Sequence, residues 1–191
     1  MMTVRNTLLS LTIACFLSLS TGVLGKEVPE RDDIDPAYKW DLSDMYASTA
    51  AWEADRDRFI DALPGLEQYR GQLGTDGPTL LTAIESIQGV ETIIANLYVY
   101  AGLRSYEDTR VSENAARYSE AQSLYAQYQQ ALSYFTPELL TIPEEALSQF
   151  IADTPALALY RHYFDETARM RPYTLSEAEE KLLAMASDPL D

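Results

Sequence analysis

LLTAIESIQGVETIIANLYVYA, residues 80–101, carries the clearest structural signal in the chain. Its apolar residues recur three or four positions apart, which places them on one face of an α-helix. Because this apolar stripe is broad, we expect a helix of about 25 residues that packs on more than one side. The stripe consists of Leu80, Ile84, Ile87, Val90, Ile94, Leu97 and Ala101.

The residues on either side of this helix predict where it begins and ends. A loop with three glycines, residues 71–78, precedes it. Within the loop, Asp76 can cap the helix and Pro78 suits a first helical turn. Residues 107–109 should end the helix.

Two further long helices are predicted beside it. Residues 52–73 carry apolar residues on one helical face. Pro64 should kink or divide this helix because proline lacks an N–H donor and clashes with the preceding turn. Residues 111–135 carry a second apolar stripe, which Thr136 and Pro137 should end.

Shorter helices are predicted in the last third of the chain. Pro143 and Pro155 should each open one, with Thr154 capping the second. Ser176 and Glu179 have the spacing of a capping box for a final helix. Because no stretch alternates apolar and polar residues for long enough to require a strand, we expect an all-α fold. Its architecture should be an antiparallel array of long helices.

The first 25 residues differ from the rest. An apolar run, residues 8–19, is too short for a spanning helix of roughly 20 residues. We therefore expect residues 1–25 to be a cleaved secretory signal peptide, and the protein to be exported to the periplasm or the exterior. Two alternatives remain: lipoprotein anchoring at Cys15, which we rank lower, and an uncleaved N-terminal anchor.

The remaining sequence has the composition of one folded domain. Residues 26–39 are charged and contain two prolines, so they should form an extended leader before a helical domain over residues 40–191. Apolar residues make up 47% of the 191 residues, enough to build a core.

The net charge of −16 opposes binding to nucleic acid and to anionic membrane surfaces. We expect no nucleic-acid partner, and no membrane contact beyond the signal segment.

The chain lacks the residue patterns of a hydrolytic centre. It has one histidine, His162, and one cysteine, Cys15, which lies in the predicted signal peptide. A catalytic zinc takes three protein ligands, commonly with a His-Glu-x-x-His motif, which is absent. A Gly-x-Ser-x-Gly elbow is absent as well. We predict no catalytic residue, no metal ligand and no cofactor in this chain, and no activity for the chain alone.

A basic cluster near residue 165 is the candidate for substrate binding. Arg161, Arg169 and Arg171 could hold a peptide carboxylate by paired hydrogen bonds. We favour the alternative that they pair with nearby acids at a contact between domains. His162 could contact a substrate or a missing domain, and here too we favour a simpler role as a hydrogen-bonded packing residue.

Tyrosine is abundant, with 13 residues in the chain. An aromatic wall can line a peptide groove because the ring packs while the hydroxyl stays in water. At helical spacing the same residues more often fill the core, which we favour. Those in or near the long helices are Tyr98, Tyr100, Tyr106, Tyr118, Tyr125, Tyr128 and Tyr134.

Four segments that follow one another along the chain resemble the N-terminal region of the oligoendopeptidase F family. The members of this family are thimet-oligopeptidase-like zinc metallopeptidases. The four segments are YKWDLSDMY (38–46); LYVYAGLR (97–104) with EDT (107–109); FTPELL (135–140) with PEE (143–145); and YRHY (160–163) with RPYTLS (171–176) and EEKLL (179–183). One departure is Tyr173, where relatives commonly carry histidine. That position is not a metal ligand in the family pattern.

The resemblance implies the N-terminal, channel-covering region of a helical metallopeptidase that hydrolyses short peptides. In this family the N-terminal helices cover a deep channel that holds zinc, and the metal ligands and general base lie far beyond the position of Asp191. Zinc is therefore implied only for the complete enzyme. The expected partners are the missing catalytic domain, in cis or in trans, and oligopeptides. The alternative function is a non-catalytic helical module that binds peptides or proteins.

Overall fold

The computed structural model describes residues 29–173 and 177–186. The predicted signal peptide and Ser176 of the predicted capping box lie outside these residues. The chain divides into two compact units between Lys39 and Trp40.

In the first unit, residues 29–39 differ from the extended leader that was predicted. They contain two short 3₁₀ helices, η1 (Arg31–Asp33) and η2 (Pro36–Tyr38). Before η2 the Asp35 carboxylate accepts a hydrogen bond from the Ala37 N–H at 2.9 Å, and Pro36 supplies the backbone φ that the turn requires.

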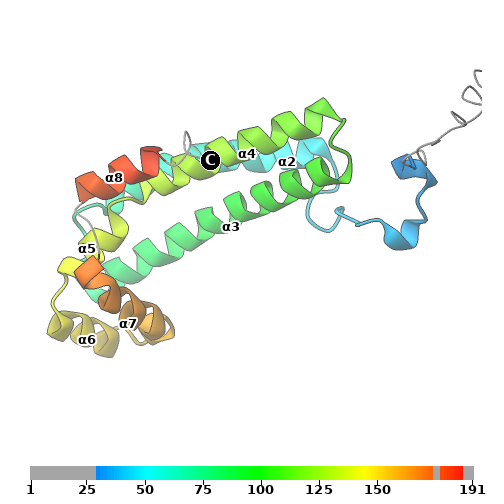
Figure 1. Ribbon diagram of the computed structural model, residues 1–191. Helices are drawn as coiled ribbons and strands as arrows, with labels where there is room; N and C mark the ends of the chain where they lie inside the picture. The colour runs from blue at the N-terminus through cyan, green and yellow to red at the C-terminus, as the bar shows by residue number, and fades with distance from the viewer. Residues whose placement is uncertain (1–28, 174–176, 187–191) are drawn as a thin grey trace, which may run out of the picture. The chain divides into compact units, whose positions relative to one another are not determined.

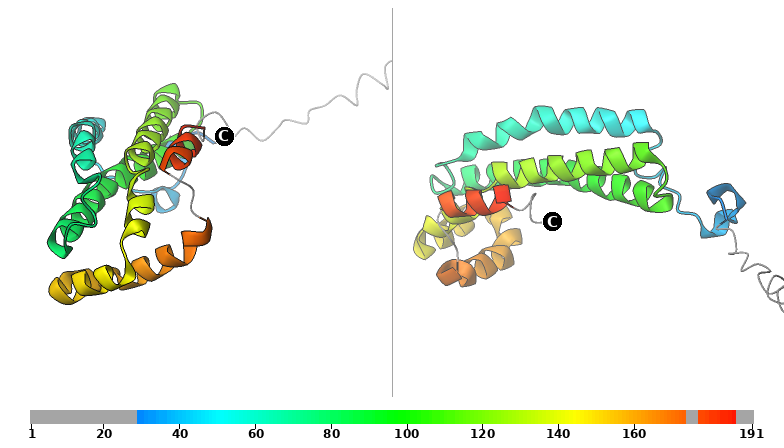
Figure 2. Two further views of the ribbon diagram at one scale, coloured as in Figure 1. Left: turned by 90° about the vertical axis from the view of Figure 1, so that its left-hand side faces the viewer. Right: turned by 45° about the horizontal axis from the view of Figure 1, so that its top comes forward.

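In the second unit, every regular element that the structure describes is helical, which confirms the all-α prediction (Figure 1). Three long helices run side by side and antiparallel: α2 (Thr49–Ala62), α3 (Gly77–Glu107) and α4 (Ser112–Ala131) (Figures 1 and 2). The shorter helices are α5 (Phe135–Thr141), α6 (Glu144–Asp153), α7 (Arg161–Met170) and α8 (Glu177–Ala186). The 3₁₀ segments are η3 (Leu63–Tyr69), η4 (Pro155–Tyr160) and η5 (Arg171–Tyr173). None of these described helices is both long enough and apolar enough to cross a membrane.

Local chemistry explains where the long helices begin and end. Ser48 Oγ accepts a hydrogen bond from the Ala51 N–H at the start of α2. As predicted, the Asp76 carboxylate caps α3 by accepting from the Thr79 N–H at 2.8 Å. Pro64 divides the first helix as predicted: α2 ends at Ala62 and the chain continues as η3.

Two predicted features in the later helices are wrong. α4 ends at Ala131, and Pro137 does not end it but lies in the first turn of α5, where no N–H donor is needed. Thr154 makes no side-chain capping hydrogen bond, and the segment after it is the 3₁₀ helix η4. The Thr154 side chain instead packs against the start of α3, where a Cβ built on Gly77 would lie only 2.4 Å from its Oγ1.

The apolar stripes predicted from the sequence meet in one core. The stripe of α3 is buried along its whole length, and so are the apolar residues of the first helical segment at Trp52, Phe59, Leu66 and Leu73. α6 packs against α3, and α7 against α5 and η4. The core therefore extends from the three long helices under the shorter ones.

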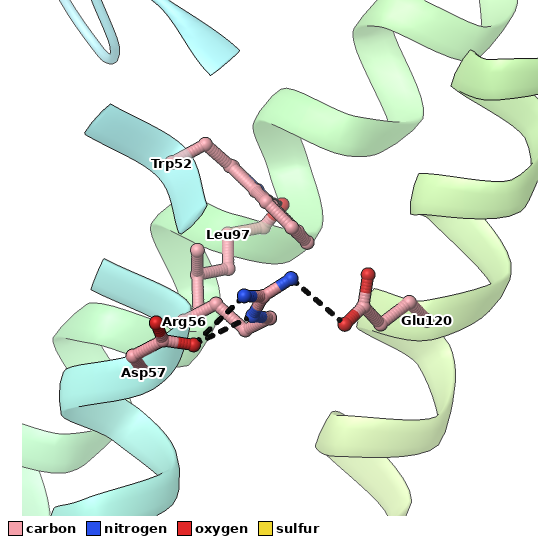
Figure 3. Close-up of polar contacts among 5 residues, drawn as sticks. All are labelled: Trp52, Arg56, Asp57, Leu97 and Glu120. Carbon is pink, nitrogen blue, oxygen red and sulfur yellow. Dashed lines mark hydrogen bonds and ion pairs between the residues drawn. The ribbon is translucent and has the colours of Figure 1, made fainter. Parts of the chain in front are cut away.

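Trp52 joins the three long helices (Figure 3). Its side chain is 1% exposed, and its indole N–H donates to the Leu97 carbonyl oxygen on α3 at 3.0 Å. The guanidinium groups of Arg56 on α2 and Arg117 on α4 lie 5.9 and 5.7 Å from the indole ring centroid. Arg56 also pairs with Glu120 on α4 at 3.3 Å, so polar contacts surround a buried aromatic anchor.

Glu138 of α5 forms hydrogen bonds to the loop before α3. Its two carboxylate oxygens accept the backbone N–H groups of Gly71 at 2.7 Å and Leu73 at 2.8 Å. Gly71 has a φ of 75°, a conformation that favours glycine. Nearby, the Tyr134 hydroxyl donates to the Leu66 carbonyl oxygen at 2.8 Å. These bonds fix the position of α5 beside the long helices.

Candidate functional site

A groove of about 490 Å³ lies where α3, α4 and α5 meet η4 and α7. Its lining combines three chemical types. The aliphatic and phenyl side chains are Ile84, Ile87, Leu132 and Phe135; the tyrosines are Tyr128, Tyr160 and Tyr163; the other polar side chains are Gln88, Glu91, Gln129 and Thr136.

The α3 side of the groove is one face of that helix. Ile84, Ile87, Gln88 and Glu91 follow the spacing of three, four and seven residues that aligns side chains on a helix. The two isoleucines are buried and belong to the core, whereas Gln88 and Glu91 are exposed. The apolar stripe of α3 therefore turns polar where it enters the groove.

Tyrosines form the facing part of the lining. The Tyr160 hydroxyl of η4 donates to Gln88 Oε1 at 2.9 Å, which ties this wall to α3. Tyr128 of α4 is buried, and Tyr163 of α7 is 43% exposed. Rings from three elements thus meet over one apolar surface.

The electrostatics of the groove centre on Glu91. Burial, and then the negative charge of Glu91, raise the pKa of the Tyr128 hydroxyl. Burial also raises the pKa of Tyr163; hydrogen bonding to Thr167 and Thr136 lowers it, and Glu91 raises it again. Both hydroxyls are therefore protonated at neutral pH, so the formal charge among the lining residues belongs to Glu91.

A series of tyrosine rings leads along α3 and α4 to this groove. Tyr106 contacts Tyr118, Tyr118 contacts Tyr98, and Tyr98 contacts Tyr125, with ring centroids 5.7, 5.4 and 5.6 Å apart. Tyr125 then contacts Tyr128, which lines the groove, at 6.3 Å.

The seven tyrosines singled out in the sequence differ in burial, and two of them, Tyr98 and Tyr118, are partly buried against the core. Tyr100, Tyr128 and Tyr134 are core residues, as the favoured interpretation predicts. Tyr106 and Tyr125 are exposed on the surface of the helix pair. Only Tyr128 among the seven lines the groove.

The substrate-binding candidates from the sequence all lie on exposed positions outside the groove lining. Arg161 and His162 occupy the first turn of α7, between the groove residues Tyr160 and Tyr163. Arg169 pairs with Glu166 on the same helix, and Arg171 lies in η5. Their role in substrate binding stays a prediction.

The sequence patterns did not predict four polar residues of the groove: Gln88, Glu91, Gln129 and Thr136. A signal was present on α3, because Gln88 and Glu91 continue the helical spacing of Ile84 and Ile87. The other half of the groove depends on where α5 and α7 fold back, which no local pattern reports.

The part of the chain that the structure describes offers no metal centre. Within residues 29–173 and 177–186, no group of three or more His, Cys, Asp or Glu side chains is placed to hold a metal ion. These residues therefore do not fit a catalytic zinc, which needs three protein ligands.

Known proteins resemble this chain in sequence. A family model described as Oligopeptidase F matches residues 138–191. Oligopeptidase PepF of Bacillus subtilis (strain 168) is 35% identical over 164 residues, which are 86% of this chain and 24% of that protein. Group B oligopeptidase PepB of Streptococcus agalactiae serotype III (strain NEM316) is 30% identical over 158 residues, which are 83% of this chain and 26% of that protein.

The fold of this chain is also similar to that of an oligoendopeptidase. The crystal structure of oligoendopeptidase-F from Enterococcus faecium matches with a TM-score of 0.69 and 31% identity, over 73% of this chain and 27% of that chain. This chain thus spans about a quarter of the length of the relatives it matches. Sequence and fold agree over the helical unit, and the chain belongs to the oligoendopeptidase F family of metallopeptidases, of which it is an N-terminal region.

Proposed function

We propose that residues 40–191 are the channel-covering region of an exported zinc oligopeptidase that hydrolyses short peptides. The observation that supports this proposal is the match to oligoendopeptidase-F, with a TM-score of 0.69 over 73% of the chain. We assign zinc binding and catalysis to a catalytic domain outside the described residues, joined in cis or supplied in trans.

The physical role of this region is to provide shape and exclusion. Three long helices share one core, and Trp52 and Glu138 fix neighbouring elements through buried or charged hydrogen bonds. Such a close-packed wall resists deformation, so it can limit which substrates reach a channel beneath it. The acidic surface would attract basic peptides at long range.

Complementation with a relative tests this function. The purified chain is mixed with Bacillus subtilis oligopeptidase PepF that lacks its matching quarter. We expect the chain alone to cleave no peptide with added zinc. We expect the mixture to form a complex on size-exclusion chromatography and to cleave short peptides, while unfolded proteins of domain size stay intact.

The control is the shortened PepF without the chain. Zinc-dependent cleavage by the chain alone, stopped by a chelator, would contradict the assignment of catalysis to another domain. A mixture that forms no complex, or that degrades large unfolded proteins as readily as short peptides, would contradict the channel-covering role.

Export through residues 1–25 is part of the proposal and has its own test. A C-terminally tagged chain should be found outside the cytoplasm at a mass reduced by the signal peptide, and deletion of residues 2–25 should retain it inside. A Cys15→Ser variant should be processed like the original. Failure of that variant to be processed would favour the lipoprotein alternative.

The groove supports a second candidate function, a non-catalytic module that binds peptides. Its lining mixes apolar, aromatic and polar side chains in a volume of about 490 Å³, which is typical of ligand sites. Peptide binding without any complex between the chain and the shortened PepF would favour this function over the first.

A further inference from the structure

We propose that the groove between α3, α4, α5 and α7 binds a short peptide through a positively charged group that lies next to an apolar side chain, with Glu91 as the counter-ion. This inference rests on the proposed handling of peptides and names the class of peptide. The positive group is either a lysine or arginine side chain or the N-terminal ammonium.

The charge of the lining selects a cation. Glu91 is the one acidic residue among the described residues that line the groove, and no lysine or arginine lines it. Arg161 and His162 lie between the lining residues Tyr160 and Tyr163 in the sequence, but they are not part of the lining. A peptide carboxylate would therefore meet a like charge here, and a cation would meet an opposite one.

The field of Glu91 extends across the groove. Its negative charge contributes to the raised pKa of Tyr128 on α4 and of Tyr163 on α7, two elements that face α3 from different directions. A cation placed among these three side chains would be attracted by the carboxylate, and tyrosine rings also attract cations.

The apolar part of the lining gives the cation a defined neighbour. Ile84, Ile87, Leu132 and Phe135 offer a surface continuous with the core. A volume of about 490 Å³ fits one or two amino-acid residues at the scale of ordinary ligand pockets. The groove thus suits an apolar side chain beside a charged group better than an extended polar segment.

Two amides on the rim suit a peptide group. The Tyr160 hydroxyl donates to Gln88 Oε1, so the Gln88 NH₂ is the group that could donate to a peptide carbonyl. Gln129 Nε2 donates to the Tyr125 hydroxyl at 2.8 Å, which leaves Gln129 Oε1 as an acceptor for a peptide N–H. The polar rim therefore offers one donor and one acceptor.

Paired probes test the charge selection and separate its two sources. The full chain, labelled with ¹⁵N, is titrated with N-acetyl-Phe-Arg-amide and with its neutral isostere N-acetyl-Phe-citrulline-amide. A second pair is Phe-Leu-amide and N-acetyl-Phe-Leu-amide. We expect the charged member of at least one pair to bind about three- to tenfold more tightly, with amide shifts around Glu91 and Thr136.

Matched variants place the effect in the groove. Glu91→Gln removes the exposed carboxylate without disturbing the core, so it should equalise the two members of the selected pair and leave the affinity for the neutral member unchanged. Glu85→Gln removes the same charge from an exposed position of α3 outside the lining, and it should keep the selectivity. Tyr163→Ala should weaken both members.

Three results would overturn the proposal: equal affinities within both pairs, the same loss of selectivity in Glu85→Gln as in Glu91→Gln, or no binding of any probe. These results leave the channel-covering function intact, because complementation of PepF measures that function without the probes. Conversely, selective binding by a chain that fails to complement PepF supports the groove and contradicts the channel-covering role.

Discussion

Trp52 shows how a single side chain joins three helices. Its indole N–H donates to the Leu97 carbonyl oxygen on α3, and its ring lies near the guanidinium group of Arg56 on α2 (Figure 3). The guanidinium group of Arg117 on α4 also lies near the ring. The other tryptophan, Trp40, is 57% exposed. The two residues therefore form a matched pair of one buried and one exposed indole in the same unit.

Replacing Trp52 with phenylalanine should destabilise the fold by about 2 kcal/mol. The change removes a buried hydrogen bond and leaves a void beside the Leu97 carbonyl. The control, Trp40→Phe, should change the free energy of unfolding by less than about 0.5 kcal/mol. Urea denaturation followed by circular dichroism measures both, and equal losses would show that Trp52 is not an anchor.

Asp108 at the turn between α3 and α4 provides a prediction about titration. Hydrogen bonds from the Arg110 side chain and backbone N–H lower the pKa of this carboxyl to about 2. Because the pKa of Asp108 is lower in the folded state, its ionised carboxylate stabilises the fold at pH values above the ordinary pKa. This contribution to folding stability is lost as the pH falls through the pKa of the folded state.

An Arg110→Gln variant should raise the pKa of Asp108 toward its ordinary value, measured by ¹³C NMR titration of the side-chain carboxyl. The carboxyl of Asp76, which caps α3, serves as the internal control and should titrate as before. An unchanged pKa at Asp108 would mean that the backbone N–H of residue 110 alone maintains the shift.

At the scale of helices, the close approach of α3 and α6 depends on a glycine. A Cβ at Gly77 would lie 2.4 Å from Thr154 Oγ1 and 2.9 Å from the Phe150 carbonyl oxygen. The second contact involves backbone, which cannot rotate away. A Cβ at Gly89, also in α3, would meet nothing within 4 Å.

The two glycines should therefore respond in opposite directions to alanine. Gly77→Ala should cost about 1–3 kcal/mol because α6 must shift. Gly89→Ala should stabilise by about 0.5–1 kcal/mol because alanine favours the helix. Thermal unfolding of both variants measures the difference, and a neutral Gly77→Ala would show that α6 can move away from α3 at little cost.

The helices were largely predictable because their signals are local. The stripe of α3, the Asp76 cap and the division at Pro64 each depend on neighbours within one turn. The end of α4 was not predictable, because Pro137 is equally compatible with ending a helix and with starting one. The groove was predictable only on its α3 side, since Tyr160 and Tyr163 reach it through tertiary packing.

At the scale of the whole molecule, the core begins after the leader. Its first buried member is Tyr46, whose hydroxyl donates to Asp55 at 2.9 Å, and residues 29–39 contribute none. The helical unit should therefore not depend on the leader for its stability.

Deletion of residues 1–39 should leave the urea midpoint of unfolding unchanged. A deletion extended through Trp52 removes Tyr46 and the anchor of α2, and it should lower the midpoint strongly. A lower midpoint for the shorter deletion would indicate that the leader contributes to the core.

The contrast between the two indoles has an optical consequence. Trp40 faces water, whereas Trp52 is enclosed, with its N–H bonded to a carbonyl and cations beside its ring. Fluorescence from Trp52 should be blue-shifted and protected from acrylamide, and that from Trp40 should be quenched readily. The protected component would then report, without any label, on whether the junction of α2, α3 and α4 stays closed when a peptide or a catalytic domain binds.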